Sequence, residues 1–378
     1  MTLAEEEAGT VKMAPHGAHV HARRADAPHV HYVGCRTTQE RQALGQGITV
    51  WSPQGDGRWR HLQTLVTTNP SWLVLNERGE FLYALHGDGG TVTAYRILRG
   101  GDLEELNTVS SGGTNPVHAV IDHRGRLVIA NYASGTVAVL PRDERGALGE
   151  PTAILSLRGE PGPDPVGQAS SHPHQIVLDP RRRVGYVPDK GLDAIFTIDL
   201  DRDTPAVVHA APTASGTGPR HAILANGGGT DLLYVVGELD STLSTWVLPD
   251  GGPELHRQWC ASTLSARAGS STASGITASA DGRFLYVSNR GDDTIACFAV
   301  APSGEPRLIE VVDCLGAYPR FIRFDPSTGS LVVANENSHD VVEFGVDSDS
   351  GRLSPGRVLA QTGSPVCVVS RGGRESVR

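Results

Sequence analysis

The chain has 378 residues, including 45 glycines and 24 prolines, and only 5% of its residues are aromatic. This composition favours many turns and short strands over long helices. The formal net charge of -9 argues against a nucleic-acid-binding protein, which would carry a basic face. It leaves an anionic substrate open, because a local arginine cluster can dominate one pocket.

The first 28 residues predict a flexible, acidic N-terminal extension without an apolar signal core. Histidines recur between residues 16 and 31 without a zinc-binding spacing, so we predict no metal site and no cofactor. These histidines are His16, His19, His21, His29 and His31.

The five cysteines show no CxxC pairing, which indicates reduced thiols. A membrane-spanning helix needs an apolar run of about 18 residues or more, and the sequence has no such run. We therefore expect a cytoplasmic protein that binds neither membranes nor nucleic acid, and that is a monomer or a weak homodimer.

A repeat begins at residue 69. Six similar segments follow one another, and each predicts a short strand, a polar turn, a second strand, a tight turn and a third strand. A more variable stretch after each segment suits an outer fourth strand. The segments are residues 69–97, 115–140, 172–200, 218–248, 274–300 and 318–346.

The repeats share an anchor position whose intervals are 46, 57, 46, 54, 46 and 46 residues. Repeats of about 40–50 residues with four strands are typical of propeller blades. A solenoid is the alternative, but it needs polar caps that this chain lacks. The anchors are Pro70, Pro116, Pro173, Pro219, Ala273, Pro319 and Pro365.

The seventh repeat has only residues 364–370 before the chain ends, so its other strands must come from elsewhere. Residues 29–35 and 47–53 have strand character and suit this purpose. Such closure removes free sheet edges. We predict an all-β fold, a seven-bladed β-propeller over residues 29–370 whose last blade is closed by the N-terminal segment, with residues 371–378 as a tail.

One face of this propeller should carry the chemistry, because the first and second strands of a blade are antiparallel. The anchor and the turn after the second strand then lie at the same end in every blade. Beside the anchors lie His118, His172, His174, Arg220, His221, Tyr318 and Arg320. The fourth position after the tyrosine-like residue of the second strand holds Gly87, Tyr132, Lys190, Glu238, Arg290 and Glu336.

Arginine grips carboxylates and phosphates, and His or Glu moves protons near neutral pH, so this ring predicts an acid/base site for an anionic ligand. Structural roles compete for the same residues. His174 and His221 suit hydrogen bonds to neighbouring blades, and Arg290 with Glu238 suits an inter-blade bridge. No GxSxG elbow supports a serine hydrolase. Residues 158–175 predict a long loop over the channel mouth.

The chain resembles the seven-bladed propeller lactonases, a family that includes propeller-type 6-phosphogluconolactonases and fungal carboxymuconate lactonizing enzymes. The resemblance covers residues 32–369 and rests on HYVGC, SHPHQIVLDP, GPRHAIL, GELDST, DGRFLYVSNRG, AYPRFIRFDP, LVVANENSHDVVEF and SPVCVV. The sequence departs from the family at two places on the ring, and these leave the substrate open. One is Leu85-His86-Gly87, where relatives tend to show Asn-Glu, and the other is Pro188-Asp189-Lys190.

The resemblance implies that His172, His174, Arg220, Glu238 and Arg290 line the active site, and we predict these as the catalytic residues. The ring adds six predicted substrate-binding residues, which are His118, Tyr132, Lys190, His221, Arg320 and Glu336.

The leading hypothesis is hydrolysis of an anionic sugar lactone, by default 6-phospho-D-glucono-1,5-lactone. Arg220, Arg290 and Arg320 would hold the phosphate or polarise the carbonyl, and Glu238 or a histidine would activate water. One alternative is a lactonizing or cycloisomerising enzyme for a muconate-like unsaturated carboxylate, or a specialised-metabolism cyclase. Another is a non-catalytic binding platform, which the charged, His-rich ring disfavours.

Overall fold

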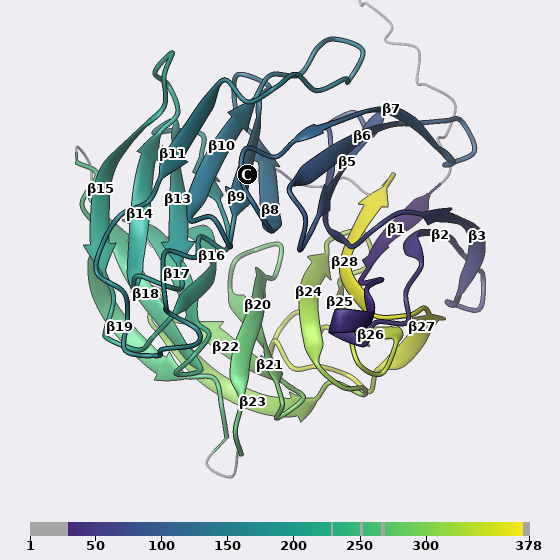
Figure 1. Ribbon diagram of the computed structural model, residues 1–378. Helices are drawn as coiled ribbons and strands as arrows, with labels where there is room; N and C mark the ends of the chain where they lie inside the picture. Colours follow the sequence, from purple (N-terminus) through teal and green to yellow (C-terminus); the bar gives the residue numbers. More distant parts are fainter. Residues whose placement is uncertain (1–28, 228–229, 250–251, 266–268, 373–378) are drawn as a thin grey trace, which may run out of the picture.

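The computed structural model describes residues 29–227, 230–249, 252–265 and 269–372. Within them, seven four-stranded antiparallel sheets surround a central axis (Figure 1). The strands of each complete repeat pair in chain order, so the six blades built from one repeat are simple meanders. The prediction of an all-β, seven-bladed propeller is confirmed.

Blades are numbered here from the first repeat. Blade 1 contains β4 (Pro70–Leu75), β5 (Phe81–His86), β6 (Thr91–Ile97) and β7 (Leu103–Ser110). Blade 2 contains β8 (Pro116–Ile121), β9 (Leu127–Asn131), β10 (Thr136–Leu140) and β11 (Ala153–Ser156). Blade 3 contains β12 (Val177–Asp179), β13 (Val184–Asp189), β14 (Ala194–Asp199) and β15 (Ala206–Pro212).

The second half follows the same plan. Blade 4 contains β16 (Pro219–Gly227), β17 (Thr230–Gly237), β18 (Thr242–Leu248) and β19 (His256–Ser262). Blade 5 contains β20 (Thr272–Ala278), β21 (Phe284–Arg290), β22 (Thr294–Val300) and β23 (Pro306–Asp313). Blade 6 contains β24 (Pro319–Asp325), β25 (Ser330–Asn335), β26 (Asp340–Gly345) and β27 (Arg357–Gln361).

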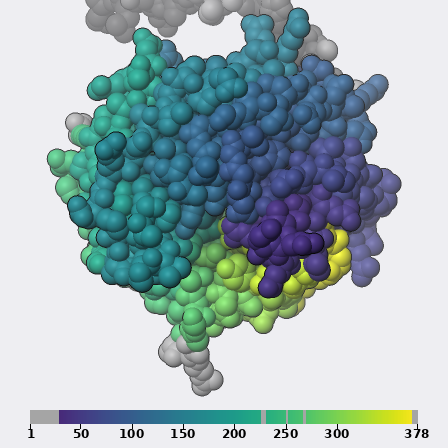
Figure 2. All heavy atoms as spheres, in the orientation of Figure 1, coloured from purple at the N-terminus to yellow at the C-terminus, as the bar shows by residue number. Residues whose placement is uncertain are grey.

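Blade 7 joins the two ends of the chain. Its inner strand is β28 (Pro365–Arg371), followed outward by β1 (Val30–Cys35), β2 (Gly47–Pro53) and β3 (Trp59–Val66). β1 and β28 are antiparallel, and on the surface the purple N-terminal residues lie beside the yellow C-terminal ones (Figure 2). The predicted closure by the N-terminal segment is confirmed, and β3 is a third N-terminal strand that the sequence analysis did not identify.

The ends of the chain bear on the predicted boundaries. β28 runs to Arg371, one residue into the segment predicted as a tail. Residues 1–28 lie outside the described residues. In the described part of the chain, no helix is long and apolar enough to cross a membrane. A 3-10 turn, η1 (Gln39–Arg41), links β1 to β2.

The core lies between neighbouring blades. Each blade is covered on both faces, so its middle strands are continuous apolar runs rather than alternating ones; β9 and β10 bury every residue. The outer strands are more exposed, and β11 alternates between half-buried and exposed residues. The burial pattern thus explains why the sequence repeats show their strongest apolar runs in the second and third strands.

Repeated tyrosines on second strands connect one blade to the next. The hydroxyl groups of Tyr32, Tyr83 and Tyr286 donate hydrogen bonds of 2.8, 3.0 and 3.1 Å to the carbonyls of glycines in the following blade. Tyr234 donates in the same way to Gly304, at 2.8 Å. These tyrosines are fully buried, and each bond gives a partner to a buried hydroxyl group and to a backbone carbonyl.

Candidate active site

A repeated backbone hydrogen bond fixes the ring residues at one end of the propeller. The N–H of the residue after the second strand donates to the carbonyl just before the anchor. Lys190 donates to His172 at 3.0 Å, Glu238 to Gly218 at 2.8 Å, and Glu336 to Tyr318 at 3.0 Å. The predicted ring positions therefore share one rim.

The same bond identifies a ring residue that the sequence analysis missed. The N–H of Arg36 donates to the carbonyl of Ser364 at 2.9 Å, which makes Arg36 the equivalent position of blade 7. A sequence signal was present, because Arg36 is the fourth residue after Tyr32, the blade 7 counterpart of Tyr83. The rule was not extended to the N-terminal segment.

A β-bulge at the start of several inner strands aims a second set of side chains at the axis. The pairing register skips one residue after Pro70, Pro116, Pro219 and Pro319. Bulges re-aim the residue that they insert. The inserted residues include Arg220 and Arg320, which line a narrow axial cavity together with Arg36, Ser71, His174 and His221.

Glu238 is the centre of a buried charge cluster drawn from three adjacent blades. Its Oε1 lies 2.6 Å from Lys190 Nζ, and its Oε2 lies 2.8 Å from Arg220 Nε and 3.1 Å from Arg290 Nη2. The side chains of Arg220 and Arg290 are only 2% and 5% exposed. The structure thus brings together four of the predicted site residues.

Opposing effects act on the Glu238 carboxyl. Burial by itself would raise the pKa of Glu238, but Arg290, Arg220 and Lys190 outweigh it and hold that pKa well below its usual range. Glu238 is therefore ionised at neutral pH and a weak proton acceptor. Its geometry suits a carboxylate that fixes three cations around one point.

The two arginines are held from a second side as well. Arg220 Nη1 donates to the carbonyl of Ser274 at 2.8 Å, and Arg290 Nη2 donates to that of Ala273 at 3.1 Å. The Arg290 guanidinium also lies over the Tyr318 ring, 5.3 Å from its centroid. Both guanidiniums are thus oriented before any ligand arrives.

Three histidines of the inner part of the ring, His118, His174 and His221, form a buried aromatic group near the Glu238 cluster. The ring centroids of His174 and His221 are 5.2 Å apart, and those of His118 and His221 are 6.2 Å apart. Burial and then the Arg220 charge lower the pKa of His118 to about 3, and both lower the pKa values of His174 and His221 well below the usual range. All three imidazoles are neutral at neutral pH.

His174 differs from its neighbours in one respect. Its Nδ1 is buried and has no hydrogen-bond partner among the described residues, although the side chain lines the axial cavity. His118 Nδ1, by contrast, accepts a hydrogen bond from the Ile176 N–H at 3.3 Å. A neutral imidazole with an uncommitted nitrogen at a cavity wall is able to accept a proton or a hydrogen bond from a ligand.

His172 and Tyr132, unlike the three buried histidines, are partly exposed on the rim. Their rings stack with centroids 4.3 Å apart, and His172 Nδ1 lies 2.9 Å from the Tyr132 carbonyl. Lys190 Nζ lies 6.0 Å from the centroid of the Tyr132 ring. These residues join blades 2 and 3 beside the Glu238 cluster.

The long loop before blade 3 meets the ring at Lys190. Gln168 Nε2 donates to the Lys190 carbonyl at 2.9 Å, and the Gly162 N–H donates to the Gly191 carbonyl at 2.9 Å. The loop predicted over residues 158–175 is therefore anchored on the turn that carries Lys190, where it borders the candidate site.

A second charge cluster lies on the blade 6, 7 and 1 side of the ring. Arg320 Nε lies 3.7 Å from Glu336 Oε2. Arg36 Nη1 lies 3.5 Å from Asp88 Oδ2, and the same carboxylate also pairs with Arg41. The predicted residues Arg320 and Glu336 therefore belong to a different charge group from Glu238.

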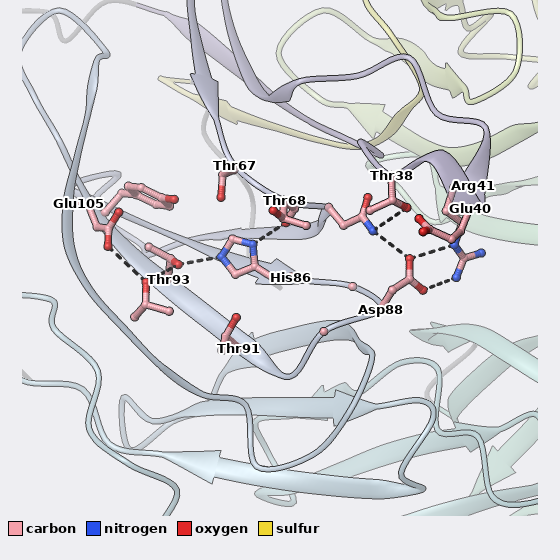
Figure 3. A pocket seen from close by; sticks show the side chains of 15 residues that line it. Thr38, Glu40, Arg41, Thr67, Thr68, His86, Asp88, Thr91, Thr93 and Glu105 are labelled. Atoms are coloured by element: carbon pink, nitrogen blue, oxygen red, sulfur yellow. Dashed lines mark hydrogen bonds and ion pairs between the residues drawn. The ribbon is translucent and has the colours of Figure 1, made fainter.

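A larger hollow, of about 860 Å³, lies beside this second cluster, between η1 and the outer strands of blade 1 (Figure 3). Asp88 accepts hydrogen bonds from Arg41 and Asn69, and His86 lies between the Thr68 carbonyl and the Thr93 hydroxyl. These groups already have partners, so they offer little to a ligand. The hollow reaches the ring at Gly87 and Asp88.

Within the described ranges, no three His, Cys, Asp or Glu side chains gather as a metal site would require. His16, His19 and His21 lie outside the described residues. His31 stacks on Trp59 and bonds Ser370 at 2.8 Å, near the end of β28 away from the ring.

Comparison with known proteins places these features in a family. The family model described as "Lactonase, 7-bladed beta-propeller" matches residues 30–370. A 6-phosphogluconolactonase of Bacillus subtilis is 33% identical over 79% of this chain and 86% of its own length. A 6-phosphogluconolactonase of Formosa agariphila is 30% identical over 75% and 83%.

A solved structure agrees with the sequence matches. The periplasmic gluconolactonase of Pseudomonas aeruginosa superposes with a TM-score of 0.81 and 28% identity, covering 90% of this chain and 98% of that one.

Proposed function

The chain belongs to the seven-bladed β-propeller lactonase family, and from this premise we propose that it hydrolyses the ring ester of an anionic sugar lactone. The default substrate is 6-phospho-D-glucono-1,5-lactone, because similar proteins carry the name 6-phosphogluconolactonase. The observation that supports this most directly is the Glu238 cluster, where three cations share one carboxylate and leave positive charge at the ring.

Arg220 and Arg290 are proposed to act on the lactone carbonyl. Their guanidiniums are buried and held from two sides, so they need no reorganisation when charge develops on the carbonyl oxygen. Fixed cations in a dry site stabilise such an oxyanion strongly. Glu238 is proposed to fix their positions together with Lys190.

His174 is the better candidate for the base that activates water. The sequence left Glu238 and a histidine as alternatives, and both oxygens of the Glu238 carboxylate are already paired with cations in the cluster. His174 is neutral and has an unpartnered Nδ1 at the cavity wall. In this scheme water adds to the carbonyl as its proton passes to His174, and the imidazolium returns that proton to the ring oxygen as the C–O bond breaks.

The remaining ring residues are proposed to bind and orient the substrate. His172 and Tyr132 form a stacked wall beside Lys190. His221 packs against the His174 ring, and His118 packs against His221. Arg320 lines the axial cavity and faces Glu336, and this pair suits the polar end of the ligand that is remote from the ester.

We place the protein in the cytoplasm as a monomer or weak homodimer. All five cysteines lie in the described ranges and none is paired, which suits a reducing compartment. No metal or cofactor enters the proposed reaction.

The decisive experiment is a substrate panel with the purified full chain. We expect hydrolysis of 6-phospho-D-glucono-1,5-lactone above the subtracted spontaneous rate, read through a coupled dehydrogenase, and unchanged rates after exhaustive chelation. Unphosphorylated gluconolactone and muconates form the comparison arms. Turnover of a muconate without lactone hydrolysis would replace this proposal by the cycloisomerase, and loss of activity on chelation would overturn its metal-free chemistry.

A further inference from the structure

We propose that Arg36, together with Arg320, forms an anion subsite on the blade 7 side of the channel mouth, and that this subsite takes the phosphate of a phosphorylated substrate. The proposal rests on the proposed function in its choice of substrate. It assigns the two ends of the ligand to opposite sides of the channel mouth: the ester to Arg220, Arg290 and His174, and the phosphate to Arg36 and Arg320.

Arg36 is a buried guanidinium with few partners. Its side chain is 2% exposed and lines the axial cavity with Arg220 and Arg320. Its Nε has no hydrogen-bond partner among the described residues, and its ion pair with Asp88 is long at 3.5 Å. Buried donors are normally satisfied, so an orphaned guanidinium N–H at a cavity wall points to a missing acceptor.

The carboxylates near Arg36 are committed elsewhere. Asp88 accepts from both nitrogens of the Arg41 fork, with an Nε bond of 3.0 Å, and from Asn69 Nδ2 at 2.9 Å (Figure 3). Glu336 faces Arg320 at 3.7 Å, which is beyond hydrogen-bond distance. Neither carboxylate therefore closes the fork of Arg36 or of Arg320.

The local charge balance leaves room for an anion. Three guanidiniums, those of Arg36, Arg41 and Arg320, face the two carboxylates of Asp88 and Glu336, an excess of one positive charge. Burial, followed by the charges of Arg320 and Arg41, lowers the pKa of Arg36. An anion bound between Arg36 and Arg320 would relieve this repulsion.

Gly87 is the reason that Arg36 fits on the ring. The other ring positions of blades 2 to 6 carry side chains, but blade 1 has glycine there. A Cβ on Gly87 would lie 2.5 Å from Arg36 Nη1 and 2.8 Å from Ser71 Oγ. The guanidinium of blade 7 thus occupies space that a blade 1 side chain would fill, which gives a physical meaning to the unusual Leu85-His86-Gly87 sequence.

Two guanidinium forks suit a phosphate monoester. Its three terminal oxygens accept several charge-assisted hydrogen bonds at once, and arginine matches that geometry in a two-pronged fashion. A sugar hydroxyl would satisfy the orphaned donor but would leave the excess charge in place. The subsite should therefore distinguish phosphorylated from unphosphorylated ligands.

Calorimetric binding to the full chain tests the subsite without depending on turnover. The probes are 6-phosphogluconate, gluconate and inorganic phosphate, used with the parent protein and Arg36→Gln. We expect Arg36→Gln to weaken 6-phosphogluconate and phosphate binding by about 10- to 100-fold, the range for one charge-assisted contact, and to leave gluconate binding unchanged. An unchanged ratio of 6-phosphogluconate to gluconate affinity would overturn the subsite.

Two variants separate binding from a structural role. Asp88→Asn removes the carboxylate that competes for Arg36, so phosphate affinity should be at least as high as in the parent. If the Arg36–Asp88 pair were purely structural, Arg36→Gln and Asp88→Asn would lower the melting temperature equally. The ratio of 6-phosphogluconate to gluconate affinity would then stay unaltered. Arg323→Gln removes a guanidinium that bonds Ser370, near the end of β28 away from the ring, and should not change either affinity.

Gly87→Ala offers a route that keeps the arginine, in case Arg36→Gln does not fold. It should displace Arg36 and weaken phosphate binding in the same direction, and retained phosphate affinity would count against the subsite. The two proposals fail differently. If the parent protein has no lactonase activity but Arg36→Gln loses the preference for 6-phosphogluconate over gluconate, the subsite is upheld and the function is rejected. If the parent is an active lactonase and Arg36→Gln keeps that preference, the function is upheld and the subsite is rejected.

Discussion

At the scale of single residues, the site separates positive charge from proton transfer. Lys190, Arg220 and Arg290 converge on the Glu238 carboxylate, while the neutral histidines lie below them. Charge stabilisation and water activation can then be disturbed independently, which gives the two catalytic assignments different signatures in kinetics and in stability.

His174→Gln should lower kcat on the lactone by about 10²- to 10⁴-fold, the usual contribution of a general base. KM and the melting temperature should change little, because the Nδ1 of His174 makes no hydrogen bond within the described residues. Steady-state kinetics with the spontaneous rate subtracted, alongside thermal unfolding, provide the check. Full turnover in this variant would remove His174 from the mechanism.

Glu238→Gln should reduce both stability and turnover. The substitution keeps the shape but leaves Arg220, Arg290 and Lys190 buried without their counter-charge, and breaking a buried ion pair typically costs about 3–5 kcal/mol. Denaturant unfolding measures the first effect and kcat/KM the second. A variant with unchanged stability and abolished kcat would instead favour the original alternative of Glu238 as base.

At the scale of secondary-structure elements, two local devices build the ring. The backbone bond before each anchor holds the end of the second strand, and the bulge after the anchor turns Arg220 and Arg320 toward the axis. The backbone bond recurs with the sequence repeat, and the sequence analysis predicted its consequence, that the ring positions share one rim. The bulge depends on how each inner strand packs at the crowded centre, so strand periodicity in the sequence did not reveal it.

The tyrosine bonds between blades should contribute measurably to stability. Tyr286→Phe removes the 3.1 Å bond to the Gly351 carbonyl and should lower the free energy of unfolding by about 0.5–1.5 kcal/mol. Because Tyr286 lies in the core between blades, kcat and KM should match the parent values. A loss of turnover without a loss of stability would show that blade contacts control the site in some other way.

At the scale of the whole molecule, the joining of the two chain ends in blade 7 also completes the ring. β1 both closes the propeller against β28 and delivers Arg36 to the rim. Fold closure and the proposed anion subsite thus depend on the same segment.

Acid should destabilise the protein through its buried histidines. Burial, the largest cause, lowers the pKa values of His31 and His118 to about 3 and those of His174 and His221 well below 6.5. Between its folded and unfolded pKa values, such a histidine takes up its proton only when the protein unfolds. Its contribution to the free energy of unfolding is therefore complete above pH 6.5 and is lost as the pH falls toward the folded pKa. Each should contribute a slope of about 1.4 kcal/mol per pH unit in that window.

Urea unfolding at pH 8, 6.5 and 5.5 measures this slope. His118→Gln should reduce it by the equivalent of about one proton. Equal stability of the parent protein at pH 8 and pH 5.5 would contradict the assignment of neutral, buried histidines beneath the ring.

The sequence by itself determined the period, the all-β class, the number of blades, the closing partner of the last repeat and the face on which the charged residues meet. These follow from strand periodicity and antiparallel geometry, which act within one repeat. Only the tertiary structure decided that Glu238 is shared by three cations, that His174 keeps an unpartnered nitrogen, and that Arg36 enters the space left by Gly87. Each of these depends on side chains from different blades meeting at the axis, and distance along the chain gives no measure of that approach.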